Sequence, residues 1–251
     1  MLFAQAFGQG PDLVFLHGFL GSGDNFWPHA QALQDRYRCW LVDLPGHGRS
    51  PHIPRYTMST LAEGVHETLQ GLGLGPVRLV GHSLGGKVGA RLSQLHPEDL
   101  ASLVMADISP APTRPKHGAI LHAMRTLPLD QLQRREDAEP YLREAEPVMD
   151  VRRFLLKNLT PKEGGGWAWK PDIEAFERDE EQMLTEALVG KPWPGKALLI
   201  RALKSDYVSD ADLGAAKEQF PNLEVKTMDA GHWLHAEKPQ EFVGILKDFL
   251  N

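Results

Sequence analysis

The chain has 251 residues, 42% of them hydrophobic and 24% charged, which is typical of one large globular domain or one domain with an insertion. Its net charge of −6, without any lysine- or arginine-rich run, excludes a surface for a phosphate backbone, so we expect no nucleic-acid partner. No stretch reaches the about 20 apolar residues that span a bilayer, and the start lacks a signal-peptide pattern, so we expect no membrane association and a cytoplasmic location.

Short apolar runs alternate with longer helical patterns on both sides of a central segment. This alternation is typical of a mostly parallel sheet flanked by helices, so the fold class we predict is α/β. We expect buried strands at residues 13–16, 39–42, 77–80, 102–105, 197–200 and 225–228. We expect helices at residues 57–72, 84–95, 210–219 and 240–250.

The first chemical motif is F-L-H-G-F-L-G-S-G at residues 15–23, which leaves a strand and enters a glycine-rich loop. Glycines let the backbone approach a substrate closely, so the amide of Phe19 is a candidate donor to a developing oxyanion. We interpret His17 as a structural hydrogen-bonding residue of this loop. A helix should follow, with Asp24 or Asn25 as its N-cap.

The strongest motif is G-H-S-L-G-G at residues 81–86, between a predicted strand and a predicted helix. In a G-x-S-x-G turn, the flanking Gly81 and Gly85 let the backbone fold tightly enough to expose Ser83 above the sheet. The following helix presents its N-terminus to the same place, so the amide of Leu84 is a second candidate oxyanion donor. This context favours Ser83 as a nucleophile over an idle serine in a glycine-rich turn.

The central segment differs from the rest of the chain in its hydrophobic pattern. Strand-like runs vanish between residues 112 and 194, and charged helical patterns replace them, with prolines at both ends. We therefore predict a core of residues 1–111 and 195–251 with a helical cap, or lid, at 112–194. Within the cap, Trp167 and Trp169 share a face if the chain is extended, and that face is either an apolar substrate wall or cap core, which we favour.

Near the C-terminus, D-A-G-H-W-L-H-A-E-K-P at residues 229–239 places His232 in a glycine-led loop. Serine attack needs a general base with a pKa near the working pH, and histidine is the usual choice. We take His232 as the base and His235 as its competitor, because the preceding glycine gives His232 the tighter loop. We interpret His47 and His82 as structural or solvated.

These motifs and D-L-P-G-H-G-R-S at residues 43–50, in this order, resemble the α/β-hydrolase superfamily over essentially the whole chain. The resemblance implies the α/β-hydrolase fold with a cap domain. The serine at the elbow disfavours the haloalkane dehalogenase and epoxide hydrolase chemistries, which place an aspartate there. The superfamily is chemically broad, so the substrate does not follow from the fold.

The acid that orients the histidine is the open question. In most of the superfamily it follows the strand at 197–200, and this alignment puts Ser205 where the aspartate belongs and Asp206 one residue late. The stretch D-I-S-P resembles a branch of small bacterial carboxylesterases and thioesterases that take the acid from an earlier strand, which here gives Asp107. The acid must bond to the histidine and be buried. We favour Asp107 over Asp206, with Asp210 as a helix cap.

The function we predict is hydrolysis of small acyl esters or thioesters through an acyl-enzyme, by Ser83, His232 and Asp107, without a metal or cofactor. One alternative is elimination, as in the menaquinone-pathway synthases that the first half also resembles, which would need arginines in the cleft. The insertion offers Arg114, Arg125, Arg152 and Arg153. A second alternative is a non-catalytic ligand receptor. The sequence does not indicate an oligomeric state.

Overall fold

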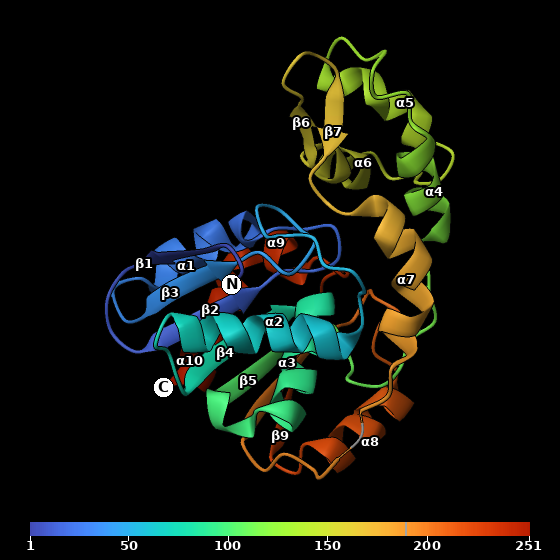
Figure 1. Cartoon of the computed structure of the whole chain (residues 1–251). Coiled ribbons are helices and arrows are strands. Elements are labelled where there is room, and N and C mark those ends of the chain that lie inside the picture. Colours follow the sequence, from blue (N-terminus) through green and yellow to red (C-terminus); the bar gives the residue numbers. More distant parts are fainter. Residues whose placement is uncertain (189) are drawn as a thin grey trace.

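The computed structural model describes residues 1–188 and 190–251, and within them seven strands form one sheet in the order β1-β3-β2-β4-β5-β8-β9 (Figure 1). Only β1 runs antiparallel to its neighbour among these strands, so the predicted α/β fold class with a mostly parallel sheet is confirmed. The sequence did not indicate β1. The strands are β1 (Ala4–Phe7), β2 (Asp12–Leu16), β3 (Arg38–Val42), β4 (Val77–His82), β5 (Leu100–Ala106), β8 (Lys196–Ala202) and β9 (Leu223–Met228).

Helices cover both faces of the sheet, because successive strand side chains point in opposite directions. Along β2, Phe15 packs into the apolar cluster shared with the α1 and α10 side, and Leu16 packs into the cluster on the α2 and α3 side. In the part of the chain that the structure describes, no helix is long and apolar enough to cross a membrane. The helices of the core are α1 (Trp27–Leu33), α2 (Met58–Gly71), α3 (Leu84–Leu95), α8 (Asp210–Gln219), α9 (Leu234–Glu237) and α10 (Pro239–Leu250).

Two predicted helix caps are wrong. Ser22, not Asp24 or Asn25, is the N-cap of the short 3-10 helix that precedes α1, and the Asn25 side chain accepts from the Ser22 amide at 2.9 Å. Ser209, not Asp210, caps α8, and its side chain accepts from the amide of Asp212. In both cases the serine stands just before the first helical residue, a position that serine favours because its short hydroxyl can accept from a free amide, as that of Ser209 does.

Helices are the main regular structure of the segment between β5 and β8, but the expectation that it lacks strands is wrong. Strands β6 (Leu159–Pro161) and β7 (Trp167–Trp169) pair as an antiparallel hairpin. Residues 164–166, all glycines with positive φ, make the turn that β-branched strand residues could not adopt. Figure 1 shows this hairpin standing away from the sheet together with α4 (Gly118–Thr126), α5 (Glu139–Leu142) and α6 (Met149–Leu156).

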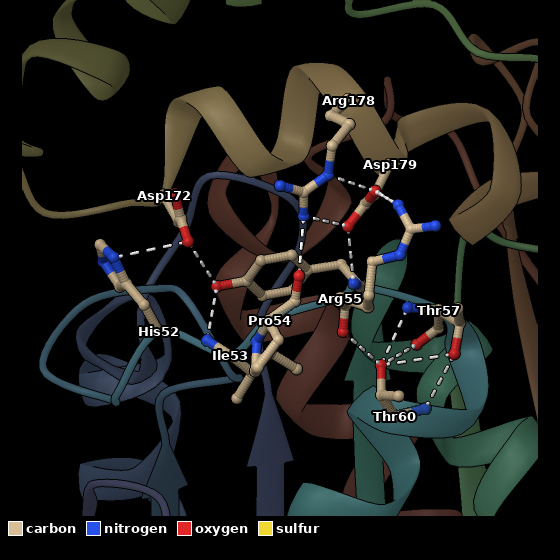
Figure 2. A network of polar contacts seen from close by, with 10 residues as sticks. His52, Ile53, Pro54, Arg55, Thr57, Thr60, Asp172, Arg178 and Asp179 are labelled. Carbon is tan, nitrogen blue, oxygen red and sulfur yellow. Dashed lines mark hydrogen bonds and ion pairs between the residues drawn. The ribbon is translucent and has the colours of Figure 1, made fainter.

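Helix α7 (Ile173–Thr185) leads from that outer part back to the core, where a polar network holds it (Figure 2). Asp172, its N-cap, accepts from the Tyr56 hydroxyl at 3.0 Å, and Asp179 accepts from the Tyr56 amide at 2.9 Å. Arg55 and Arg178 also bond to Asp179, whose side chain is almost completely buried. Because a buried carboxylate needs such partners, these contacts fix α7 against the loop before α2.

Candidate active site

Ser83 lies in a sharp turn between β4 and α3, where the motif predicted it. Its φ of 50° falls in the left-handed region, which is strained for a residue with a side chain. A Cβ on Gly81 would lie 2.3 Å from the carbonyl carbon of Gly85, and one on Gly85 would lie 2.3 Å from the carbonyl oxygen of Leu16. Both positions therefore require glycine, and the tight turn exposes the serine hydroxyl at the end of the sheet.

The structure brings Ser83, His232 and Asp107 into one chain of hydrogen bonds. His232 lies in the loop between β9 and α9, and its Nε2 accepts from Ser83 Oγ at 3.1 Å. Its Nδ1 donates to Asp107 Oδ2 at 2.8 Å. Asp107 directly follows β5 and is fully buried. Ser83, His232 and Asp107 thus have the spacing that a serine hydrolase needs.

Two further donors fix the Asp107 carboxylate. The amide of Ala202 donates to Oδ1 at 2.9 Å, and the hydroxyl of Ser205 donates to Oδ2 at 2.5 Å. Ser205 stands at the position where the sequence comparison with most of the superfamily expects the acid, and here its hydroxyl bonds to Asp107. Each carboxylate oxygen therefore has a defined partner, which sets the plane presented to the imidazole.

The other two candidate acids lie elsewhere. Asp206 has a mostly exposed side chain and pairs with Lys116 at 3.1 Å, and this hydrogen bond lowers the pKa of the Asp206 carboxyl. Asp210 is also exposed and pairs with Arg201 at 2.6 Å. Among the described residues neither carboxylate bonds to His232, and of the three candidates Asp107 is the one that contacts the imidazole.

Two residues that sequence reasoning did not assign to the site also hold His232. The Tyr207 ring stacks on the imidazole, with ring centroids 3.6 Å apart and planes 11° from parallel. His82 Nε2 donates to the carbonyl of His232 at 2.8 Å, and burial holds the pKa of His82 well below its usual value, so the ring stays neutral. Their positions next to Asp206 and Ser83 in the sequence were the available signal.

The loop after β2 lies against the elbow. A Cβ on Gly18 would lie 2.9 Å from Nδ1 of His82, so this glycine allows the close approach to the elbow that places Phe19 beside Ser83. His17 is buried and holds the loop, with Nδ1 donating to the Gly18 carbonyl at 2.8 Å and Nε2 accepting from the Leu44 amide at 2.9 Å. Both its nitrogens are occupied, which agrees with a structural role.

A cavity of about 230 Å³ opens beside Ser83. A second, more polar cavity of about 220 Å³ is lined in part by Leu20, and Ser83 is not among the described residues that line it. The cavity beside Ser83 is therefore the candidate substrate site. Its walls combine apolar and charged side chains: Phe19, Leu84, Ile108, Leu184, Lys87, Thr113, Arg114, Lys116, His117, Asp206, Tyr207 and Asp212.

Trp167 and Trp169 are not among the described residues that line the cavity beside Ser83. Both are half-buried and pack against the main apolar cluster, and Trp169 Nε1 donates to the carbonyl of Met124 at 2.8 Å. This placement fits the cap-core alternative for the pair.

Among residues 1–188 and 190–251 there is no group of three or more side chains that could hold a metal ion.

Comparison with known proteins points the same way as the geometry. The family described as "alpha/beta hydrolase fold" matches residues 11–145. The mouse sn-1-specific diacylglycerol lipase ABHD11 is 34% identical over 249 residues, covering 96% of this chain and 81% of the mouse protein. Esterase YbfF of Escherichia coli is 29% identical, covering 95% and 92% of the two chains. The solved structure of a marine microorganism esterase superposes with a TM-score of 0.95 at 33% identity, covering 99% and 98%.

Proposed function

Because the chain belongs to the α/β-hydrolase family, we propose that it is a serine hydrolase that cleaves carboxylic ester or thioester bonds of small acyl substrates. Relatives named as lipases and esterases support ester hydrolysis as the reaction class. The observation that carries the proposal is the hydrogen-bonded chain from Ser83 Oγ to His232 at 3.1 Å and from His232 to Asp107 at 2.8 Å.

In the first half-reaction, Ser83 Oγ attacks the acyl carbonyl carbon while His232 Nε2 takes its proton. Asp107 stabilises the resulting imidazolium through Nδ1 and keeps the ring in the tautomer that can accept at Nε2. The amides of Leu84 and Phe19 are the donors that we assign to the oxyanion. The Leu84 amide is available because the first amides of a helix have no partner within the helix.

To complete the first half-reaction, the imidazolium gives its proton to the leaving alcohol or thiol as the acyl C–O or C–S bond breaks, and the acyl group remains on Ser83. In the second half-reaction, His232 takes a proton from water as the water oxygen attacks the acyl carbon. The imidazolium then returns the proton to Ser83 Oγ as the acyl–Oγ bond breaks, and the carboxylic acid is released. The cavity of about 230 Å³ is smaller than the roughly 300–1,000 Å³ of sites for drug-sized ligands, which supports a short acyl chain.

The elimination alternative has less support. Elimination needs several arginines that converge on an anionic substrate. Of the four candidate arginines in the insertion, Arg114 lines the cavity. The other three each pair with a carboxylate: Arg125, Arg152 and Arg153.

A receptor with an inert site is the other alternative. A fluorophosphonate probe that labels the wild type but not Ser83→Ala separates an active nucleophile from a binding pocket.

The direct test is hydrolysis of p-nitrophenyl butyrate by Ser83→Ala, with Ser93→Ala, in the helix that follows Ser83, as the matched control. Ser93 Oγ bonds only to the carbonyl of Ala90 among its described contacts. We expect Ser83→Ala to lose at least about 10,000-fold in kcat, because the residual rate of such variants comes from binding and the oxyanion donors alone. Near wild-type turnover by Ser83→Ala would overturn the proposal.

A further inference from the structure

Lys87 is a buried lysine beside the nucleophile, and the hydrolytic mechanism gives it no part. It lies in α3 four residues after Ser83, which is about 6 Å along the axis of an α-helix. Its side chain is almost completely buried and lines the same cavity as Ser83. Since helical side chains lean toward the N-terminus of their helix, the Lys87 stem leans toward the elbow.

The Lys87 ammonium has spare hydrogen-bonding capacity. Among the described residues, Nζ donates to the carbonyl of Ala111, and the carboxylate that acts on its charge, Asp212, is not hydrogen-bonded to it. An ammonium carries three donors, and a buried charge that is not directly hydrogen-bonded to a counter-charge is unfavourable. Burial lowers the pKa of Lys87 to about 8, so the charged form still predominates at pH 7.

The other charged side chains that line the cavity do not neutralise the positive charge of Lys87. Lys116 and Asp206 pair with each other at 3.1 Å. Arg114 and Lys87 then face a single further carboxylate, Asp212, which is already bonded to the amide and hydroxyl of Ser209. The lining as a whole carries one more positive than negative charge, which an anionic group on the substrate would neutralise.

We propose that Lys87 is a specificity-determining residue that binds a free carboxylate at the far end of the acyl chain. The substrates are then half-esters or half-thioesters of short dicarboxylic acids. The inference rests on the proposed hydrolase function and goes beyond it by naming the substrate class. Hydrolysis breaks the acyl C–O or C–S bond, water supplies the new oxygen, and the products are the dicarboxylate and the alcohol or thiol.

The test compares monomethyl glutarate with methyl valerate, which differ only by a carboxylate in place of a methyl group, with methanol release as the measurement. We expect the wild type to prefer the half-ester in kcat/KM. Lys87→Met keeps the apolar stem and should reduce the ratio of the two kcat/KM values about 10- to 100-fold, the range for hydrogen bonds to charged groups. Lys217→Met, on the exposed surface of α8, is the control and should leave the ratio unchanged.

A second measurement avoids any dependence on the folding of a variant. Glutarate should inhibit wild-type hydrolysis of p-nitrophenyl butyrate at least about tenfold more strongly than valerate does, since a single charged hydrogen bond supplies this difference. Three outcomes overturn the inference while the hydrolase proposal stands. The ratio of kcat/KM values could be unchanged in Lys87→Met, or the wild type could prefer methyl valerate. The wild type could also prefer 3-acetoxypropionate, whose carboxylate is on the leaving group. If the wild type cleaves none of these esters, both fail.

Discussion

Replacing Asp107 with asparagine should slow ester hydrolysis about 1,000- to 10,000-fold, because the amide reverses the hydrogen bond to the histidine. The Ala202 amide donates to one Asp107 oxygen at 2.9 Å, so the asparagine oxygen will occupy that side. Its NH2 group then faces His232 Nδ1, which must accept. The proton moves to Nε2, and Nε2 can no longer accept from Ser83.

The matching change at Asp206 should have almost no effect. A 10,000-fold loss corresponds to about 5.4 kcal/mol of transition-state stabilisation, since each factor of ten is about 1.36 kcal/mol. Asp206→Asn removes an ion pair between the side chains of Asp206 and Lys116, which are 81% and 46% exposed. Such pairs contribute about 0.2–1 kcal/mol to stability and lie outside the hydrogen-bonded chain.

The assay is kcat for p-nitrophenyl butyrate in both variants, together with thermal unfolding to show that each is folded. A loss in Asp206→Asn comparable with that in Asp107→Asn, or Asp107→Asn activity within tenfold of the wild type, would refute the reasoning. Asp107 would then be a structural turn residue, and the usual acid position of the superfamily would operate despite its exposure.

Three other substitutions test the supporting contacts. Ser205→Ala removes one hydrogen bond to the Asp107 carboxylate, so kcat should fall about 10- to 100-fold with little change in KM; a change confined to KM contradicts this positioning role. Phe176→Ala empties a fully buried site on α7 against Phe19 and should cost about 3–5 kcal/mol in urea unfolding; a loss below 1 kcal/mol would mean that the site collapses. Burial lowers the pKa of His235 to about 3, below its unfolded value of about 6.5. As the pH falls below 6.5, His235 therefore binds a proton in the unfolded state but stays neutral in the native state, which lowers the free energy of unfolding. His235→Phe should therefore lose about 1.4 kcal/mol less stability than the wild type between pH 7.5 and pH 5.5, and equal losses would show that His235 does not carry this acid sensitivity.

The sequence predicts the parts of the fold in which local pattern and burial agree. The strand before Ser83 is apolar on both faces and the helix after it is continuous, so their bounds were within two residues of those observed. Strand β1, with a mixed pattern of half-buried residues at the edge, carries no such signal, since its partner β3 is distant in sequence. The hairpin of β6 and β7 has three-residue strands, too short for a periodic pattern.

The site is predictable where chemistry restricts the residue type. Ser83 and His232 follow from the turn that each needs, and Asp107 was preferred because it follows a buried strand. Tyr207 and Ser205 could not be assigned in the same way, because stacking on an imidazole and bonding to a carboxylate depend on loop conformation after β8. The Ser205 hydrogen bond joins positions 98 residues apart, and no single sequence records such a pairing.

The position of Asp107 also affects how this scaffold tolerates change. Ser83 and Asp107 follow two adjacent parallel strands, β4 and β5, which are joined by α3 and a short 3-10 helix, and both precede the insertion. The long segment that shapes the entrance therefore does not lie between nucleophile and acid. Insertions, deletions or replacement of the outer helices do not change the chain that connects these two groups, so the substrate range can diverge in this branch while Ser83 and Asp107 keep their relative positions.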